Sequence, residues 1–291
     1  YDDIIKKSGR WQGFMKMPMY EKIMADCESF DETLNVLRLY KEGEPLVNPN
    51  FVDMIRVAKK TKKFKVIDTT TNGALLNRGT SESIINAGID QINISVNGIN
   101  AEQFFGLTGR KIDYGKYIEQ IKYLHEISGN TTIYVKCIKQ NLSEEDQEVF
   151  YETFYPICDK IFFENLQPNW PNFSFNYIDV EYTQGHYGQP AVDKEICPFI
   201  FYMMVVNSDG SVSACVQDWS HELIVGDLKT ENIERVWNGE NFNALRHLHL
   251  ELNRCKNKVC SNCPVLKYGT LDNIDNSREL ILKRLKSIIY G

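Results

Sequence analysis

Apolar residues recur along the first 166 residues in two alternating patterns. Short, nearly continuous apolar runs predict buried strands, and stretches with apolar residues three and four positions apart predict helices that bury one face. The expected strands are residues 35–40, 64–70, 91–96, 132–138 and 160–165. The expected helices are residues 18–28, 51–60, 81–87, 114–126 and 143–154. Strands separated by helices need crossover connections, which place the strands parallel in one sheet.

These repeats predict an α/β fold, either an open sheet or a partial barrel. We expect the barrel, because polar turns follow three consecutive strands and would converge at one mouth. The pattern changes after residue 166, where a stretch rich in Pro, Asn and Tyr is typical of a connection. Further on, residues 201–207 and 211–216 flank Ser-Asp-Gly, which predicts a β-hairpin. Helices are expected at residues 232–238, 241–252 and 276–289.

Composition narrows the class of protein. The chain of 291 residues has a net charge of −6 and a pI of about 5.5, which argues against a general nucleic-acid or anionic-membrane surface. No apolar run approaches the roughly 18–20 residues of a membrane span, so we expect a cytoplasmic protein. Five of the eight cysteines crowd into the last third, which in a chain of this length favours metal binding over disulfides.

Four of these cysteines form the strongest local pattern. Cys197 and Cys215 bracket the predicted hairpin, and Cys260 and Cys263 form a Cys-x-x-Cys pair that lets both thiolates reach one metal site. Four sulfur ligands suit zinc or an iron–sulfur cluster, and spacing alone does not decide between them. The alternative is a set of unrelated thiols, and Cys255 is a fifth candidate ligand.

Polar turns follow the first two predicted strands. Gly43, Glu44 and Pro45 supply exposed backbone groups and a carboxylate suited to an ammonium group. Asn72 follows the next strand and offers an amide for a ribose hydroxyl. Each turn taken alone is equally typical of an ordinary strand–helix connection.

Polar residues also interrupt later apolar runs. Ser95 and Asn97 alternate and so share a face, where they need either a ligand or an internal network. Lys136 lies amid apolar residues, where a cation calls for an anionic partner. Asp218 lies three residues beyond Cys215 and is either a catalytic base beside a cluster or a turn residue.

Taken in order, these motifs resemble those of radical S-adenosylmethionine (radical SAM) enzymes. Residues 42–46, Glu-Gly-Glu-Pro-Leu, resemble the family's Gly-Gly-Glu-Pro motif, with Glu in place of the first Gly. Residues 71–73, Thr-Asn-Gly, and 95–98, Ser-Val-Asn-Gly, resemble its third- and fourth-strand motifs. The spacing from Cys197 through Gly210 to Cys215, followed by the Cys-x-x-Cys pair, resembles the SPASM/twitch extension that holds auxiliary iron–sulfur clusters.

The resemblance implies a partial (β/α)6 barrel that lacks its first strand, followed by a small cysteine-rich domain. It implies SAM and iron–sulfur clusters as cofactors, with one auxiliary [4Fe-4S] cluster held by the four matched cysteines. The residues implied to contact the amino group, ribose or carboxylate of SAM are Gly43, Glu44, Pro45, Asn72, Ser95, Asn97 and Lys136.

One departure from the family pattern concerns the cluster that cleaves SAM. In the family its ligands, Cys-x3-Cys-x2-Cys, precede the Gly-Gly-Glu-Pro motif, whereas here only Cys27 precedes Gly43, within a predicted helix. We expect these ligands and the first barrel strand just upstream of Tyr1. The alternative is a degenerate relative that does not cleave SAM.

The resemblance also implies a division of the chain and an activity. The expected parts are a barrel at residues 1–166, a connection at 167–196, a SPASM/twitch domain at 197–275 and a terminal helix at 276–291. We expect an oxidoreductase-type enzyme that abstracts hydrogen from a small polar or sugar-like substrate, with Asp218 as a base and flavodoxin or ferredoxin as reductant. We expect no nucleic-acid or membrane partner. Two alternatives stand: a peptide-modifying maturase, and a non-enzymatic binding protein with a structural zinc ion.

Overall fold

The computed structural model describes residues 9–168, 170–171 and 184–290. The chain divides into two compact units. One unit is Lys16–Leu166, and the other combines Tyr1–Met15 with Gln167–Gly291. The strand–helix repeats belong to the first unit and the clustered cysteines to the second.

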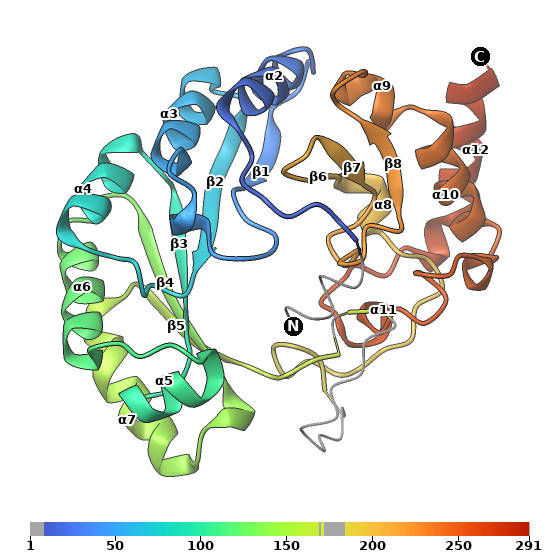
Figure 1. Cartoon of the computed structure of the whole chain (residues 1–291). Coiled ribbons are helices and arrows are strands. Elements are labelled where there is room, and N and C mark those ends of the chain that lie inside the picture. Colours follow the sequence, from blue (N-terminus) through green and yellow to red (C-terminus); the bar gives the residue numbers. More distant parts are fainter. Residues whose placement is uncertain (1–8, 169, 172–183, 291) are drawn as a thin grey trace. The chain divides into compact units, whose positions relative to one another are not determined.

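A five-stranded parallel sheet forms the centre of the first unit (Figure 1). Its strands are β1 (Leu34–Arg38), β2 (Phe64–Thr71), β3 (Gln91–Val96), β4 (Thr132–Ile138) and β5 (Lys160–Glu164). They pair in the order in which they occur along the chain, so each helical connection leads to the neighbouring strand. The positions of the expected strands are confirmed to within two residues at either end, and the α/β fold class is confirmed. The burial expected of the first strand is wrong, because β1 lies at the edge of the sheet and none of its residues is buried.

Helices cover one face of this sheet (Figure 1). The main helices are α2 (Met17–Glu28), α3 (Phe51–Thr61), α4 (Arg78–Ala87), α5 (Ala101–Thr108), α6 (Tyr114–Glu126) and α7 (Glu144–Phe154). Single turns of 3-10 helix lie at η1 (Pro45–Val47), η2 (Lys139–Asn141) and η3 (Tyr155–Ile157). All of the expected helices in this unit are present, and α5 is an additional one.

Side-chain caps explain where several helices begin. The Asn77 side chain accepts a hydrogen bond from the Thr80 N–H at 3.0 Å, so α4 starts earlier than its apolar pattern predicts. Helix α7 begins with a capping box formed by Ser143 and Asp146, since each side chain accepts a bond from the other's backbone N–H. Asn100 caps the short helix α5 in the same way as Asn77.

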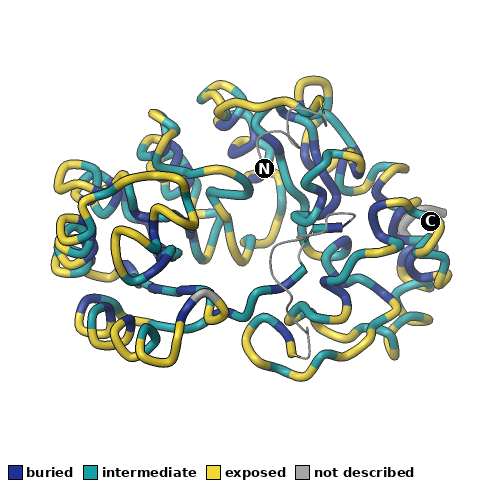
Figure 2. The backbone as a smooth tube through the Cα atoms, turned by 60° about the horizontal axis from the view of Figure 1, so that its bottom comes forward, coloured by how far each residue is buried: buried dark blue, intermediate teal, exposed yellow. Residues whose placement is uncertain are grey.

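The core lies between the sheet and its helices. Ile92, Ile94 and Val96 on β3 are at most 3% exposed, and they alternate with polar residues that face the opposite side of the sheet. Where α7 packs on β5, the ring of Phe150 on the helix lies 4.8 Å from the ring of Phe163 on the strand, between centroids. Each large apolar side chain buried in this way contributes about 1.5–3 kcal/mol to stability. In Figure 2 the buried stretches of the chain lie mainly inside each unit, and exposed stretches form its outer turns.

The second unit is built around a small antiparallel sheet. Its strands are β6 (Val205–Val206), β7 (Ser211–Ser213) and β8 (Ile224–Asp227), in the order β6-β7-β8. The helices are α8 (Phe199–Tyr202), α9 (Ile233–Trp237), α10 (Glu240–Leu250), α11 (Val265–Tyr268) and α12 (Arg278–Tyr290), with 3-10 turns at η4 (Arg254–Lys256) and η5 (Asp275–Ser277).

The expected hairpin is present, but both of its strands are shorter than predicted, since β7 ends at Ser213 instead of residue 216. The hairpin turns at residues 207–210, where the Gly210 N–H donates to the Asn207 carbonyl at 3.0 Å. Of the expected strand at residues 201–207, only Val205–Val206 pairs with β7. The first residues of that apolar run belong instead to helix α8, which begins directly after Pro198, a residue suited to the start of a helix. The carbonyl of Ile200 in α8 accepts a hydrogen bond from the buried Arg246 side chain at 2.9 Å instead of pairing with a strand.

Candidate cofactor sites

Four cysteines that lie far apart in the sequence line one cavity in the second unit. Cys197 lies just before α8, and Cys215 lies two residues after β7. Cys260 and Cys263 lie in the turn between η4 and α11. The other residues that line this cavity include Pro171, Asp218, His249 and Arg254. The structure thus brings together the four cysteines that the sequence analysis singles out as ligands.

Burial keeps these thiols protonated in the absence of a metal. Burial raises the pKa of Cys197 and of Cys260 to about 12, and negative charge on neighbouring cysteines adds to the rise. The pKa of Cys215 is raised well above its ordinary value by burial and then by the charge of Cys197. The thiols are therefore close enough to influence one another. A positively charged metal centre would convert them to thiolates.

The four thiols supply the type and number of ligands that one iron–sulfur cluster needs. Among the described residues, no group of three or more His, Cys, Asp or Glu side chains is arranged to hold one metal ion. Cys255 is exposed and is not among the described residues that line the cavity.

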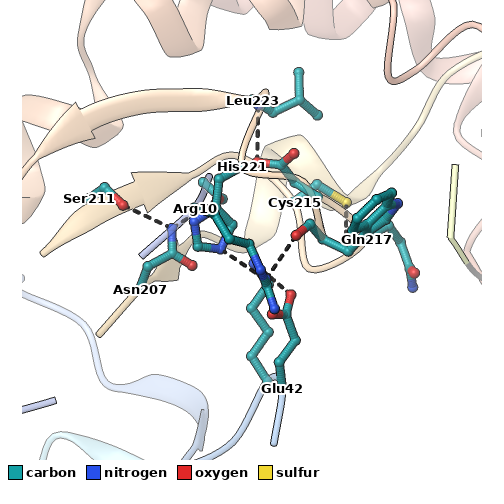
Figure 3. Close-up of polar contacts among 12 residues, drawn as sticks. Arg10, Glu42, Asn207, Ser211, Cys215, Gln217, His221 and Leu223 are labelled. Carbon is teal, nitrogen blue, oxygen red and sulfur yellow. Dashed lines mark hydrogen bonds and ion pairs between the residues drawn. The ribbon is translucent and has the colours of Figure 1, made fainter. Parts of the chain in front are cut away.

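Local hydrogen bonds hold the cysteine-bearing turns in shape. The Asn257 side chain accepts bonds from the Val259 and Cys260 N–H groups, each at 3.0 Å. Arg254 donates to the carbonyl oxygen of Cys260, so its positive charge lies beside the Cys-x-x-Cys turn. Near the other pair, the Gln217 N–H donates to the sulfur of Cys215 at 3.4 Å (Figure 3). The turns are thus held by the chain's own side chains and backbone.

Asp218 is fully buried and anchors the loop after Cys215. One carboxylate oxygen accepts from the Glu222 N–H at 2.8 Å, and the other accepts from the Leu223 N–H at 3.0 Å. The loop from Cys215 to β8 therefore closes on this carboxylate, which also lines the cysteine cavity. A catalytic role for Asp218 stays a prediction, because its observed partners are backbone groups of its own loop.

His249 is a group at this cavity that the sequence analysis does not single out. It is 1% exposed, near the end of α10, and its Nδ1 accepts a hydrogen bond from the Cys197 N–H at 3.3 Å. Burial lowers the pKa of His249 to about 4, and the charge of Arg254 adds to the fall. The imidazole is therefore neutral near pH 7. Its place in the sequence gives no signal, because the pairing with Cys197 spans 52 positions.

Two tryptophans lie close to the cysteine cavity. The Trp219 indole N–H donates to the carbonyl oxygen of Pro171 at 3.0 Å, and Pro171 lines the cavity. The ring of Trp170 lies 6.3 Å from that of Trp219 between centroids. The backbone carbonyl of Trp219 in turn accepts a bond from Arg10 at 2.8 Å, and Arg10 also contacts His221 (Figure 3).

In the first unit, Glu44 links the ends of the first two strands. Its carboxylate accepts bonds from the Leu46 N–H at 3.0 Å, the Thr71 hydroxyl at 2.6 Å and the Asn72 N–H at 2.8 Å. Gly43 precedes it with a φ of +77°, a conformation that favours glycine. The Glu44 carboxylate, which is predicted to meet the ammonium group of a ligand, thus already accepts hydrogen bonds within the protein. These bonds join two of the predicted SAM-binding loops, one that contains Pro45 and one that contains Asn72.

Two tyrosines of α6 hold the loops at the ends of β2 and β3. The Tyr117 hydroxyl donates to the Asn72 carbonyl at 3.0 Å, and the Tyr114 hydroxyl donates to the Gly98 carbonyl at 2.9 Å. Their rings lie 5.6 Å apart between centroids. Both tyrosines fall within the helix expected at residues 114–126, and their spacing of three residues is the signal that they share a face of it.

The remaining residues predicted to bind SAM lie on β3 and β4. Asn97 donates from its side-chain amide to the backbone carbonyl of Ser95 at 3.4 Å, a bond between two neighbouring positions of the chain. Ser95 lies in register with Lys136 on β4. The ammonium group of Lys136 is 2.8 Å from the carboxylate of Glu164, which is therefore the anionic partner that the sequence pattern calls for. Contact of these residues with SAM stays a prediction.

The described part of the first unit does not fit the cluster that cleaves SAM. That cluster needs three cysteines close together, whereas Cys27 lies on α2, Cys137 on β4 and Cys158 between η3 and β5. Cys27 is 5% exposed, and burial raises its pKa to about 12. The three thiols thus lie on separate parts of the unit: Cys27 and Cys137 are buried in the core, and Cys158 is half-buried.

Two family models match the chain. The radical SAM superfamily matches residues 16–150, and SPASM, an iron–sulfur cluster-binding domain, matches residues 197–264. Together the two domains imply S-adenosylmethionine and iron–sulfur clusters as cofactors. No described helix has the length and hydropathy needed to cross a membrane.

Curated relatives resemble only part of the chain. A GTP 3',8-cyclase of Chlorobaculum tepidum is 37% identical over 68 residues, which is 23% of this chain and 20% of that protein. A tungsten-containing aldehyde ferredoxin oxidoreductase cofactor-modifying protein of Pyrococcus furiosus is 29% identical over 124 residues, which is 40% of this chain and 33% of that protein. This chain therefore spans between about a fifth and a third of these two relatives.

Solved structures share the fold over most of the chain. The structure of BtrN in complex with AdoMet and 2-DOIA has a TM-score of 0.58 and 17% identity, covering 91% of this chain and 87% of that one. The structure of anSMEcpe with bound AdoMet has a TM-score of 0.62 and 14% identity, covering 96% of this chain and 91% of that one. At these identities the likeness concerns the fold alone.

Proposed function

We propose that this chain, which belongs to the radical SAM superfamily and carries a SPASM domain, is an oxidoreductase-type radical enzyme. It binds S-adenosylmethionine at the ends of the parallel strands and one auxiliary [4Fe-4S] cluster at four cysteines. Its substrate is a small polar molecule from which hydrogen is removed.

The observation that carries this proposal is the convergence of four cysteines on one cavity. Cys197, Cys215, Cys260 and Cys263 come from three separate stretches of the chain, and all of them line the same cavity. Unrelated thiols would not be expected to converge in this way. When bound there, an iron–sulfur cluster supplies a one-electron acceptor.

The loops at the strand ends support a SAM site. Glu44 fixes the Gly-Glu-Pro turn to the Asn72 backbone, and the two tyrosines of α6 fix the turns at Asn72 and Gly98. These hydrogen bonds hold the turns in one conformation before any ligand binds, which reduces the entropy lost on binding. Peptide groups and short polar side chains at this edge of the sheet suit the amino, carboxylate and ribose groups of SAM.

The polar face of the sheet supports a polar substrate. Asn93 lies between two core isoleucines and so faces the side away from the helices, where it donates to the Thr70 hydroxyl at 3.3 Å. Asp68 is 4% exposed, and Arg38 lies 3.8 Å from one of its oxygens. The other oxygen is buried and has no hydrogen-bond partner among the described residues. An acceptor of this kind suits a hydroxyl or amino group of a substrate.

The described residues do not fit the cluster that cleaves SAM, so the proposal includes no step that passes through it. A reductant of the flavodoxin or ferredoxin class is part of the proposal, because iron–sulfur chemistry needs a source of single electrons.

Metal analysis of the chain tests the proposal. The protein is purified anaerobically, supplied with iron and sulfide, and examined for iron, sulfide, zinc and visible absorption, and SAM binding is measured by isothermal titration calorimetry. We expect about four irons and four sulfides per chain, as in one [4Fe-4S] cluster, and stoichiometric SAM binding. Stoichiometric zinc without iron or sulfide would refute the cluster and support the structural zinc alternative. Absence of SAM binding would refute the strand-end site.

A further inference from the structure

We propose that His249 donates a hydrogen bond from its Nε2–H to the iron–sulfur cluster held by the four cysteines, and that this bond raises the cluster's reduction potential. The inference rests on the proposed function, because it requires that the cysteine cavity hold a cluster. It assigns a role to a residue that coordinates no metal in the proposed site.

The position of the ring proton follows from a backbone contact. The Cys197 N–H donates to Nδ1 of His249 at 3.3 Å, so Nδ1 accepts and cannot carry a proton. The ring proton must therefore be on Nε2. The same contact joins the histidine to a proposed cluster ligand, which fixes the orientation of the ring relative to that cysteine.

The Nε2 atom has no hydrogen-bond partner among the described residues, although it is buried. His249 is 1% exposed, so bulk water does not provide that partner. Buried donors are nearly always satisfied, and an unsatisfied one destabilises the fold. A donor of this kind beside a cavity indicates that the group bound there completes the bond.

The acceptors available in this cavity are mainly sulfurs. Four cysteines line it together with His249, whereas the carboxylate of Asp218 already accepts backbone bonds from its own loop. The inorganic sulfides and thiolates of a cluster accept hydrogen bonds, and such bonds are among the factors that set reduction potentials. An N–H directed at a cluster sulfur stabilises the added electron when one electron from a reductant enters the cluster.

The test compares the metal content and potential of three variants of the full chain. His249→Leu removes the donor, and His249→Gln replaces the ring with an amide that can also donate. His247→Leu is the matched control, because His247 lies on the same helix, is only half-buried and does not line the cavity. Each protein is loaded with iron and sulfide, and its potential is measured by anaerobic titration with dithionite and redox mediators, followed by electron paramagnetic resonance.

We expect all three variants to bind as much iron as the unaltered protein. In His249→Leu, the equilibrium constant for one-electron reduction should fall about tenfold, which corresponds to about 59 mV at one electron. The His249→Gln potential should lie between those of His249→Leu and the unaltered protein, and His247→Leu should leave it unchanged.

Two results would overturn the inference while leaving the cluster itself in place. The first is an unchanged potential in His249→Leu with full iron content. The second is loss of iron in both His249 variants, because this would make the histidine a ligand or a structural residue rather than a donor. Failure of the unaltered protein to bind iron is distinguishable from both, since it refutes the proposed function directly.

Discussion

The carboxylate of Glu44 should be a main source of stability in the loops at the strand ends. It accepts three hydrogen bonds, two of which come from Thr71 and Asn72 at the end of the neighbouring strand. A hydrogen bond to a charged group contributes about 1.5–3 kcal/mol, and the lower value applies because Glu44 is only half-buried. Counting the two bonds between strand ends, Glu44→Ala should lower the free energy of unfolding of the first unit by about 3 kcal/mol.

Two further variants separate the contribution of the Glu44–Thr71 bond from that of the other bonds to Glu44. Thr71→Val removes one of these bonds and also the bond that the Gly73 N–H donates to the Thr71 hydroxyl at 3.0 Å, so it should cost about 2.5 kcal/mol. Because Glu44 and Thr71 share one bond, the double variant should be less destabilised than the sum of the two single variants, by about 1.5 kcal/mol. Glu148→Ala is the control, because this glutamate is exposed on α7 and its removal should change stability by less than about 0.5 kcal/mol.

The measurement combines urea unfolding, followed by far-UV circular dichroism, with native-state hydrogen exchange at the Asn72 amide. Loss of Glu44 should speed exchange at that amide, because the Asn72 N–H donates directly to its carboxylate. An unchanged exchange rate in Glu44→Ala, together with a stability loss no larger than that of the control, would refute the reasoning.

Three other changes have distinct expected results. Cys215→Ser should reduce the iron content from about four atoms per chain to well below one, because Cys215 lines the cavity. Cys255→Ser should retain the iron, because Cys255 is exposed and is not among the lining residues, so equal iron loss in both variants would contradict the ligand assignment. Lys136→Met should lower the free energy of unfolding, measured by urea titration, by about 3 kcal/mol, because it leaves the buried Glu164 without its cation. Adding Glu164→Gln should restore part of this loss, because it removes the buried negative charge. Gly98→Ala should cost at least about 2 kcal/mol by the same measurement, because its φ is +97° and a Cβ would lie 2.5 Å from a side-chain carbon of α5; a near-neutral effect would show that this turn can adjust.

The sequence is most informative where a local pattern sets the structure. The five parallel strands follow from short apolar runs, and the capped start of α7 follows from Ser143 and Asp146. The four cysteines are identifiable because two-residue and hairpin spacings bring sulfur atoms together locally. Helix α5 is harder to predict, because its eight residues bury only Phe104 and present no continuous apolar face.

Contacts between distant residues are what the sequence does not supply. Glu44 meets Thr71 across 27 positions, and His249 meets Cys197 across 52. No repeat or residue spacing in the sequence predicts either contact, because each contact depends on how separate parts of the chain pack in three dimensions. The strand β8 (Ile224–Asp227) is missed for a related reason: four residues that include a glycine show too little alternation to indicate a strand.

The pair formed by Trp170 and Trp219 gives the proposed metal centre an optical reporter of its own. The indole of Trp219 is hydrogen-bonded to Pro171, which lines the cysteine cavity, and the second indole lies 6.3 Å away. Iron–sulfur clusters absorb broadly in the near-ultraviolet and visible range where tryptophan emits. Filling the cavity should therefore quench this emission by energy transfer, so cluster assembly and loss can be followed by fluorescence in the unlabelled protein.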